Sequence, residues 1–164
     1  MSLSDLQDVI DATRDASARP GIMRSDDGKV RNATTLADAL WTQNLLNETW
    51  GITVATIRDD GSPHAAVSFS VCLDGIIYVT ARSGTLLLHN LRARREVAIS
   101  CLGTAMDSLM AVGFVDVAGA WAGFDPSLRR LLSDARSVDS FMPADWPGYI
   151  FRFEPEKLWT TVGS

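Results

Sequence analysis

The chain has 164 residues, of which 46% are hydrophobic, and it carries a net charge of −5. A chain of this length buries roughly 70% of its unfolded surface, so we expect a single hydrophobic core. The charged residues, 21% of the chain, form no basic block, which argues against a nucleic-acid partner. We see neither a secretory signal nor an apolar run near the ~20 residues that cross a bilayer, so we expect a cytoplasmic protein without membrane contact.

The cysteines and histidines form no metal-binding pattern. Cys72 and Cys101 belong to no CxxC pair, and His64 and His89 are too few to complete a ligand set. We therefore expect no metal site, and two buried free thiols in a reducing compartment. We interpret both histidines as surface or structural residues.

The N-terminal part is predicted to hold a helix and a tether. The helix spans residues 4–18, with Ser4 as its N-cap. Its apolar face consists of Leu6, Val9, Ile10 and Thr13. The segment after it is rich in Gly, Asp, Arg and Asn, so we assign residues 1–34 to an N-terminal helix and tether, and residues 35–164 to the main domain.

A second helix is predicted directly before the first strand. It begins at Thr34 or Thr35, either of which can cap it, and it ends near Trp50–Gly51. Its apolar face would hold Leu36, Leu40, Trp41 and Leu45.

Three consecutive strands follow, joined by two hairpins. They span residues 52–58, 64–73 and 76–82 and are rich in β-branched residues. The turns between them contain Asp60–Gly61 and Asp74–Gly75, dipeptides that suit a backbone with positive φ.

A short helix is predicted after the third strand. Ser83 or Thr85 caps it, and it runs to residue 95. Its C-terminal end carries Arg92, Arg94 and Arg95, which complement the negative end of the helix dipole.

Two strands with glycines come next. The first spans residues 96–102, and the second, over residues 110–124, is unusually long. Gly113 and Gly119 interrupt the long strand, which indicates bulges of the kind that close a barrel.

The C-terminal part is predicted to contain one helix and a strand pair. Asp125 caps the helix, which begins at Pro126 and ends near residue 136. The strands span residues 148–155 and 157–163, with Glu154–Pro155–Glu156 as the turn between them.

Helices and strands therefore do not alternate, which excludes a parallel doubly wound sheet. Strands joined by hairpins, with helices in the gaps, indicate a closed or partly closed antiparallel barrel. The predicted fold class is mainly β (α+β), with peripheral helices.

Four segments, ATIRDDGSPH, IIYVTARSGT, HNLRARREVAISCL and FRFEPEKLWTT, occur in this order. In order and spacing they resemble the pyridoxamine 5′-phosphate oxidase-like superfamily, the flavin-binding split barrels. The resemblance covers residues 51–102 well, and residues 112–121 and 149–162 loosely. It implies an antiparallel split β-barrel that forms a homodimer, with the cofactor in a groove between the subunits.

The resemblance also implies a function. It indicates an FMN-dependent oxidoreductase that acts on a small organic substrate, in which the cofactor performs the redox step. A reductase that uses the deazaflavin F-420 is one alternative. Another is a non-enzymatic protein that holds haem or another planar ligand, or has lost its cofactor, because its flavin phosphate site has decayed.

The same resemblance implies the cofactor-binding residues. They are Ala66, Val67, Ser68, Thr80, Ala81, Arg82, Ser83, Thr85 and Trp159. Arg82, Ser83, Thr85 and the amides of the following helix would hold the phosphate, and Ser68 and Thr80 would orient the flavin ring. No side chain is assigned a catalytic role. Trp146 is a further candidate beside a planar ligand, although we expect the tryptophans mainly to fill a core and an interface.

The sequence departs from the family at the phosphate site. Leu86, Leu87 and Leu88 stand where relatives commonly carry basic residues, and Ala66 and Val71 stand where many carry Arg and Lys. Either the partner subunit supplies further cations, or the leucines pack in a core or interface and the site has decayed. The sequence leaves both interpretations open.

Overall fold

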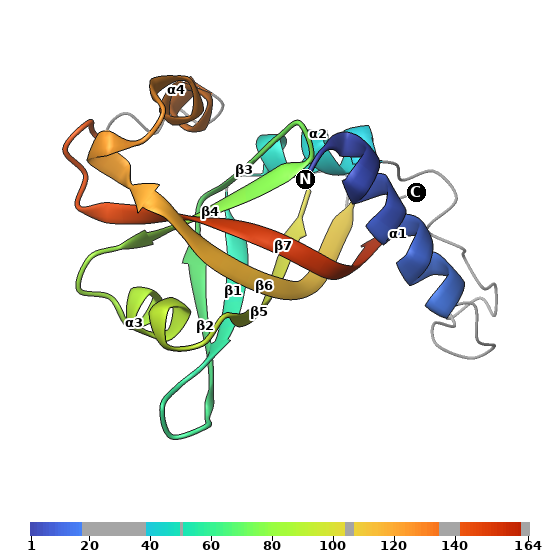
Figure 1. Ribbon diagram of the computed structural model, residues 1–164, viewed down its shortest axis with the longest axis horizontal. Coiled ribbons are helices and arrows are strands. Elements are labelled where there is room, and N and C mark those ends of the chain that lie inside the picture. The colour runs from blue at the N-terminus through green and yellow to red at the C-terminus, as the bar shows by residue number, and fades with distance from the viewer. Residues whose placement is uncertain (18–38, 50, 104–106, 135–141, 162–164) are drawn as a thin grey trace.

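The computed structural model describes residues 1–17, 39–49, 51–103, 107–134 and 142–161. Within these residues, α-helices and one short 3-10 helix surround a seven-stranded antiparallel sheet of order β2-β1-β5-β6-β7-β4-β3. The elements are α1 (Leu3–Ser17), α2 (Ala39–Glu48), β1 (Ile52–Ile57), β2 (Pro63–Ser68), β3 (Ser70–Leu73), β4 (Ile76–Arg82), α3 (Leu86–Ala93), β5 (Glu96–Leu102), β6 (Ser108–Ala120), η2 (Trp121–Gly123), α4 (Pro126–Asp134) and β7 (Gly148–Thr161). The predicted fold class, mainly β with peripheral helices, is confirmed (Figure 1).

The second predicted strand is two strands in the structure. The expected strand over 64–73 breaks at Phe69: β2 pairs with β1, and β3 pairs with β4. β2 and β3 thus lie at opposite ends of the strand order although they adjoin in sequence. The chain crosses here from one edge of the curved sheet to the other, and a single straight strand could not do so.

The predicted strand pair at the C-terminus is wrong, because β7 is one continuous strand that runs beside β6 (Figure 1). Pro155 does not form a turn; it faces Gly113 beside a register shift at which Glu156 is the extra residue in β7. Proline lacks the N–H that a regular ladder uses, so a bulge accommodates it. The predicted bulges at Gly113 and Gly119 are both confirmed, since the second register shift lies between Val117 and Gly119.

The two Asp–Gly hairpin turns form as predicted. Gly61 and Gly75 have φ of 85° and 80°, and Asp74 has φ of 50°. Gly75 is also tightly covered, because a Cβ atom there would collide with the backbone of Ser2. The second turn therefore sits directly under the start of α1.

Helix α1 packs its predicted apolar face on the barrel. Leu6 and Ile10 are fully buried, and the Thr13 hydroxyl accepts a 3.0 Å hydrogen bond from the Leu158 backbone in β7. The expected cap is wrong by two residues: Ser2, not Ser4, caps the helix. Its hydroxyl accepts from the Asp5 N–H, and its own N–H donates to the Asp5 carboxylate.

The other helices follow their predicted caps where the structure describes them. In α2, Leu45 is buried as expected, but Leu40 is 54% exposed, and Ala39, Thr42 and Leu46 complete the buried side. Its expected start at Thr34 or Thr35, and Leu36, lie outside the described residues. In α4, Pro126 is the first residue and the Asp125 carboxylate accepts from the Ser127 N–H, as predicted.

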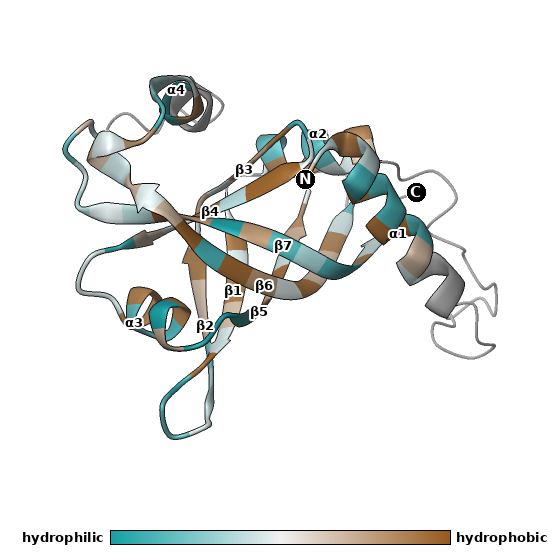
Figure 2. Ribbon diagram, in the orientation of Figure 1, coloured by the Kyte–Doolittle hydropathy of each residue, from teal (hydrophilic) through white to brown (hydrophobic). Residues whose placement is uncertain are grey.

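The hydrophobic residues gather in the strands, whereas the β1–β2 turn is hydrophilic (Figure 2). Cys72 and Cys101 are both buried thiols that form no disulfide bond, as expected from the sequence. In the part of the chain that the structure describes, no helix is long and apolar enough to span a membrane.

Candidate ligand-binding site

A pocket opens between β2, the end of β4 and the start of α3. Its volume is about 360 Å³, at the lower end of the roughly 300–1,000 Å³ that is usual for ligand sites. It is lined by His64, Ala66, Val67, Ser68, Phe69, Thr80, Ala81, Arg82, Thr85, Leu86, Leu87 and Trp146.

Seven of the nine predicted cofactor-binding residues line this pocket. They are Ala66, Val67, Ser68, Thr80, Ala81, Arg82 and Thr85. The other two do not line it. Ser83 donates its backbone N–H to the Pro147 carbonyl, 2.7 Å away. Trp159 lies near the far end of β7, where it pairs with Met110, whereas Arg82 pairs with Gly148 at the start of that strand.

The start of α3 gives the pocket a polar end. Gly84, with φ of 76°, turns the chain out of β4, and Thr85 caps the helix by accepting from the Leu88 N–H. The Thr85 hydroxyl proton is used as well, because it donates to the Arg82 carbonyl at 2.7 Å. The N–H groups of Leu86 and Leu87 are then the ones that the first turn leaves for a ligand.

Arg82 adds a positive charge at this end. It is the last residue of β4, it is exposed, and it has no ion-pair partner among the described residues. A guanidinium group beside a helix N-terminus is an environment that favours an anion.

The three leucines at the start of α3 differ in how far they are buried. Leu87 and Leu88 are buried in the main core, whereas Leu86 is 43% exposed and forms part of the pocket wall. Of the two strand positions where the resemblance implied basic residues, Ala66 lines the pocket and Val71 is buried in a second hydrophobic cluster. Arg82 is therefore the only lysine or arginine among the described residues that line the pocket.

Ser68 and Thr80 lie in the pocket wall with their hydroxyl groups engaged. Ser68 Oγ donates to the Thr80 carbonyl at 2.5 Å, and Thr80 Oγ1 donates to the Phe69 carbonyl at 3.4 Å. Their protons thus bind the backbone. Ser68 Oγ also accepts from the Thr80 N–H at 3.2 Å, which leaves it one lone pair to accept a hydrogen bond from a ligand. Beside them β2 is an edge strand, which presents unpaired backbone N–H and C=O groups.

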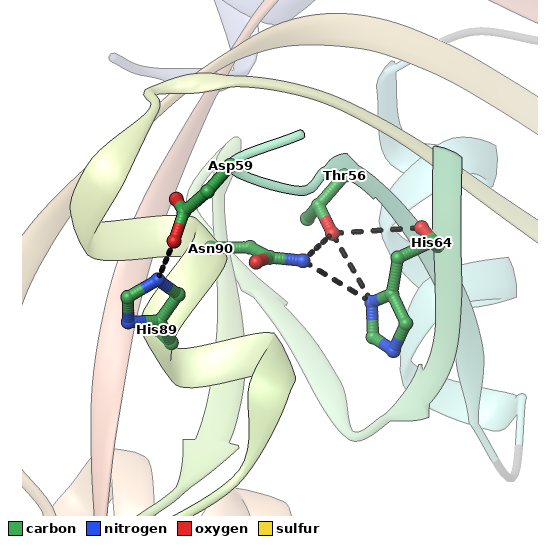
Figure 3. A network of polar contacts seen from close by, with 5 residues as sticks. All are labelled: Thr56, Asp59, His64, His89 and Asn90. Atoms are coloured by element: carbon green, nitrogen blue, oxygen red, sulfur yellow. Dashed lines mark hydrogen bonds and ion pairs between the residues drawn. The ribbon is translucent and has the colours of Figure 1, made fainter. Parts of the chain in front are cut away.

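A buried polar network supports one wall (Figure 3). Asn90 Nδ2 donates to Thr56 Oγ1 at 2.9 Å, and both groups approach His64 Nδ1, at 3.4 and 3.2 Å respectively. The sequence favoured a surface position for His64, with a place beside a cofactor or substrate as the alternative, and the structure has it in the pocket lining. The signal was present in the hairpin, because the tight Asp60–Gly61 turn places His64 directly opposite Thr56.

No protein-family model matches the sequence, and no curated protein matches it. Solved structures do match. A protein related to general stress protein 26, of the pyridoxinephosphate oxidase family, from Clostridium acetobutylicum has a TM-score of 0.53 and 17% identity, over 75% of this chain and 92% of that one. An F420 reductase has a TM-score of 0.58 and 20% identity, over 71% and 94%. A heme binding protein from Mycobacterium smegmatis has a TM-score of 0.55 and 15% identity, over 74% of this chain and 56% of that one.

These similarities agree with the fold predicted from the sequence. The chain has the split-barrel fold of the pyridoxamine 5′-phosphate oxidase-like proteins. Because proteins of this fold bind different groups, the similarity does not identify the ligand of this chain. The ligand has to be inferred from the chemistry of the pocket.

Proposed function

We propose that this chain is a flavin-dependent oxidoreductase, which binds FMN in the pocket and acts on a small organic substrate. The observation that carries the proposal is the convergence of seven predicted cofactor residues in one pocket. At its polar end lies Arg82, which has no ion-pair partner in the part of the chain that the structure describes. The flavin would supply the redox chemistry, and the chain would bind it, orient it and exclude water from it.

The polar end of the pocket suits a phosphate in part. Arg82 and the N–H groups of Leu86 and Leu87 can donate to phosphate oxygens. Arg82 is one cation for the two negative charges of a phosphate monoester. Leu86 stands where the resemblance implied a second cation. The fit on one chain is incomplete, which favours a second subunit at this groove.

The rest of the pocket suits a planar ring. The edge of β2 offers alternating donors and acceptors, and Ser68 and Thr80 offer hydroxyl acceptors. Phe69 and Trp146 add aromatic surface beside them. In this proposal Ser68 and Thr80 orient the ring by accepting hydrogen bonds.

A homodimer would complete the groove. One row of side chains crosses five strands on the outer face of the sheet: Val67, Thr53, Ser100, Met110 and Trp159. Val67 is 79% exposed and Met110 is 52% exposed, and Val67 also lines the pocket. The row thus reaches the ligand site, and a second copy that covers its exposed apolar ends would lie beside the groove.

Light scattering during size-exclusion chromatography tests this dimer. We expect a dimer at micromolar concentration and a monomer for Met110→Glu. Leu40→Glu is the control, because Leu40 is an exposed leucine on α2, away from the row. A monomeric wild-type protein would refute the shared groove.

The deazaflavin F-420 is the closest alternative cofactor, since a reductase named for it has the same fold. Haem is a second candidate, because His64 lines the pocket and its Nε2 atom has no partner among the described residues. The heme binding protein of this fold supports considering it.

The deciding experiment is the absorption spectrum of the purified protein, followed by separate titrations with FMN, F-420 and haem. We expect tight retention of FMN, and Arg82→Ala should weaken that binding by more than about tenfold. Arg94→Ala is the control, since Arg94 is an exposed arginine at the other end of the same helix. A Soret band, or retention of F-420 alone, would replace FMN with that cofactor; retention of none would refute the oxidoreductase.

A further inference from the structure

The environment of His64 differs on the two sides of its ring. Nδ1 faces Asn90 Nδ2 and Thr56 Oγ1, while Nε2 points away from both (Figure 3). Asn90 is 1% exposed, and it approaches the ring from the second turn of α3. The ring is therefore held on its Nδ1 side by buried polar groups, and the residue lines the pocket.

The chemistry of these neighbours favours one tautomer of the ring. An amide nitrogen can only donate, and Asn90 Nδ2 lies 2.9 Å from Thr56 Oγ1, so the threonine oxygen accepts from it. The threonine hydroxyl can then donate its own proton, either to Nδ1 at 3.2 Å or to the His64 carbonyl at 3.5 Å. With Nδ1 as the nearer acceptor, and Asn90 presenting a second proton to it, the proton of the neutral ring is assigned to Nε2.

The position of the His64 ring would allow the Nε2 proton to bind a ligand in the pocket. Asn90 lies four residues after Leu86, so the two share one face of α3, and Leu86 is an uncharged pocket residue in the first turn of the helix. His64 thus stands one helical turn from the place where the pocket lacks a cation. A neutral Nε2–H group there can donate to an anionic oxygen without adding a charge.

We infer that Thr56 and Asn90 hold His64 as an Nε2–H donor, and that this donor binds a phosphate oxygen of the ligand in the pocket. The phosphate assignment rests on the proposed function, whereas the tautomer depends only on the free protein. Thr56 and Asn90 are positioning residues that act through His64. The same tautomer opposes haem ligation by Nε2, because a nitrogen bound to iron carries no proton.

Nitrogen-15 NMR of the free protein tests the tautomer directly. The chain has two histidines, and His89, which pairs with Asp59 at 2.7 Å on the surface, serves as the internal reference. Above pH 8 we expect His64 to show a protonated Nε2 and an unprotonated Nδ1. The opposite pattern would overturn the inference, since it requires Asn90 to present its carbonyl oxygen to the network.

Asn90→Asp reverses the polarity of the network at nearly constant shape. A carboxylate can only accept, so we expect the proton to move to Nδ1. If this variant does not fold, Thr56→Val gives a second test: it removes the donor to Nδ1 and should leave a mixture of tautomers, which Thr56→Ser restores to one. An unchanged tautomer in the folded variants would overturn the positioning roles.

Paired titrations with FMN and riboflavin test the ligand contact, because riboflavin lacks only the phosphate. We expect His64→Ala to weaken FMN binding about fivefold to tenfold, as for loss of a hydrogen bond to a charged group, and to leave riboflavin unchanged. His64→Gln should recover part of the loss, and His89→Ala should change neither affinity. Equal losses for both ligands, or no loss for FMN, would overturn the phosphate contact. If the wild-type protein binds neither flavin, the proposed function and the phosphate assignment fail together, while the NMR result still decides the tautomer.

Discussion

The hydroxyl group of Ser68, the last residue of β2, donates a 2.5 Å hydrogen bond to the carbonyl oxygen of Thr80 in β4. The Thr80 N–H donates in turn to the Phe69 carbonyl at 3.0 Å. These bonds join β2, which is at one end of the strand order, to β4, which is next to β3 at the other end. The barrel therefore closes at Ser68 and Thr80, and the pocket lies against this closure.

Ser68→Ala should lower the free energy of unfolding by about 1–3 kcal/mol, because the buried Thr80 carbonyl loses a partner that water cannot replace. Urea unfolding measures the change. Ser62→Ala is the control: its hydroxyl also donates, to the Asp60 carboxylate, but in an exposed turn, so we expect a change within about 0.5 kcal/mol. Equal losses in both variants would mean that the Ser68 contact does not close the barrel.

Gly113→Ala should destabilise the protein by about 1–3 kcal/mol, as overpacking does. A Cβ atom at Gly113 would collide with the backbone of Glu154 and Pro155, which cannot move without breaking the β6–β7 ladder. Gly123→Ala is the matched control, because open space surrounds that position. If thermal unfolding shows the same midpoint for both variants, β7 can shift away from β6, and the bulge does not depend on glycine.

Local signals predicted the hairpins well, but they could not show where strands end. Asp60–Gly61 and Asp74–Gly75 determine their turns through their own φ angles. The break at Phe69 has no such signal, because it arises from the crossing between distant sheet edges. The Glu154–Pro155–Glu156 sequence has the composition of a turn, and only its partner strand, with the bulge at Gly113, keeps it extended.

The site shows the same division between local and distant effects. The residues from β2, β4 and the start of α3 could be proposed from the sequence, since they follow one another within a short stretch of chain. Trp146 comes from a loop far along the sequence, and His64 gains its surroundings from Asn90, 26 residues away. Neither contact follows from spacing along the chain.

Cys72 should be nearly inert in the folded protein. Burial raises the pKa of its thiol from 9.0 to about 12, so at pH 9 the folded protein keeps the unreactive thiol form. We expect slow alkylation by iodoacetamide at pH 9 in buffer and rapid alkylation in urea, with peptide mapping to separate Cys72 from Cys101. Rapid labelling of Cys72 without urea would contradict its burial.

The same shift makes stability depend on pH. Between pH 9 and about 12 the unfolded thiol loses its proton while the folded one keeps it, so its contribution is complete below pH 9 and declines as the pH rises. The loss should approach about 1.4 kcal/mol per pH unit in that range. Cys72→Ala should remove this part of the slope, measured by urea unfolding at several pH values; an unchanged slope would assign it to other groups.

Leu86→Lys should strengthen FMN binding, if the phosphate lies at the start of α3. Leu86 is a half-exposed pocket residue in the first turn of the helix, so a lysine there keeps its ammonium group in water beside the site that holds only Arg82. An exposed charge pair of this kind contributes up to about 1 kcal/mol, which is a gain of about twofold to fivefold in affinity. Riboflavin affinity should not change, and the gain for FMN should shrink at high salt, because screening weakens exposed pairs. Leu40→Lys adds the same charge on α2 and should have no effect; an equal gain there, or none at Leu86, would place the phosphate away from the helix start.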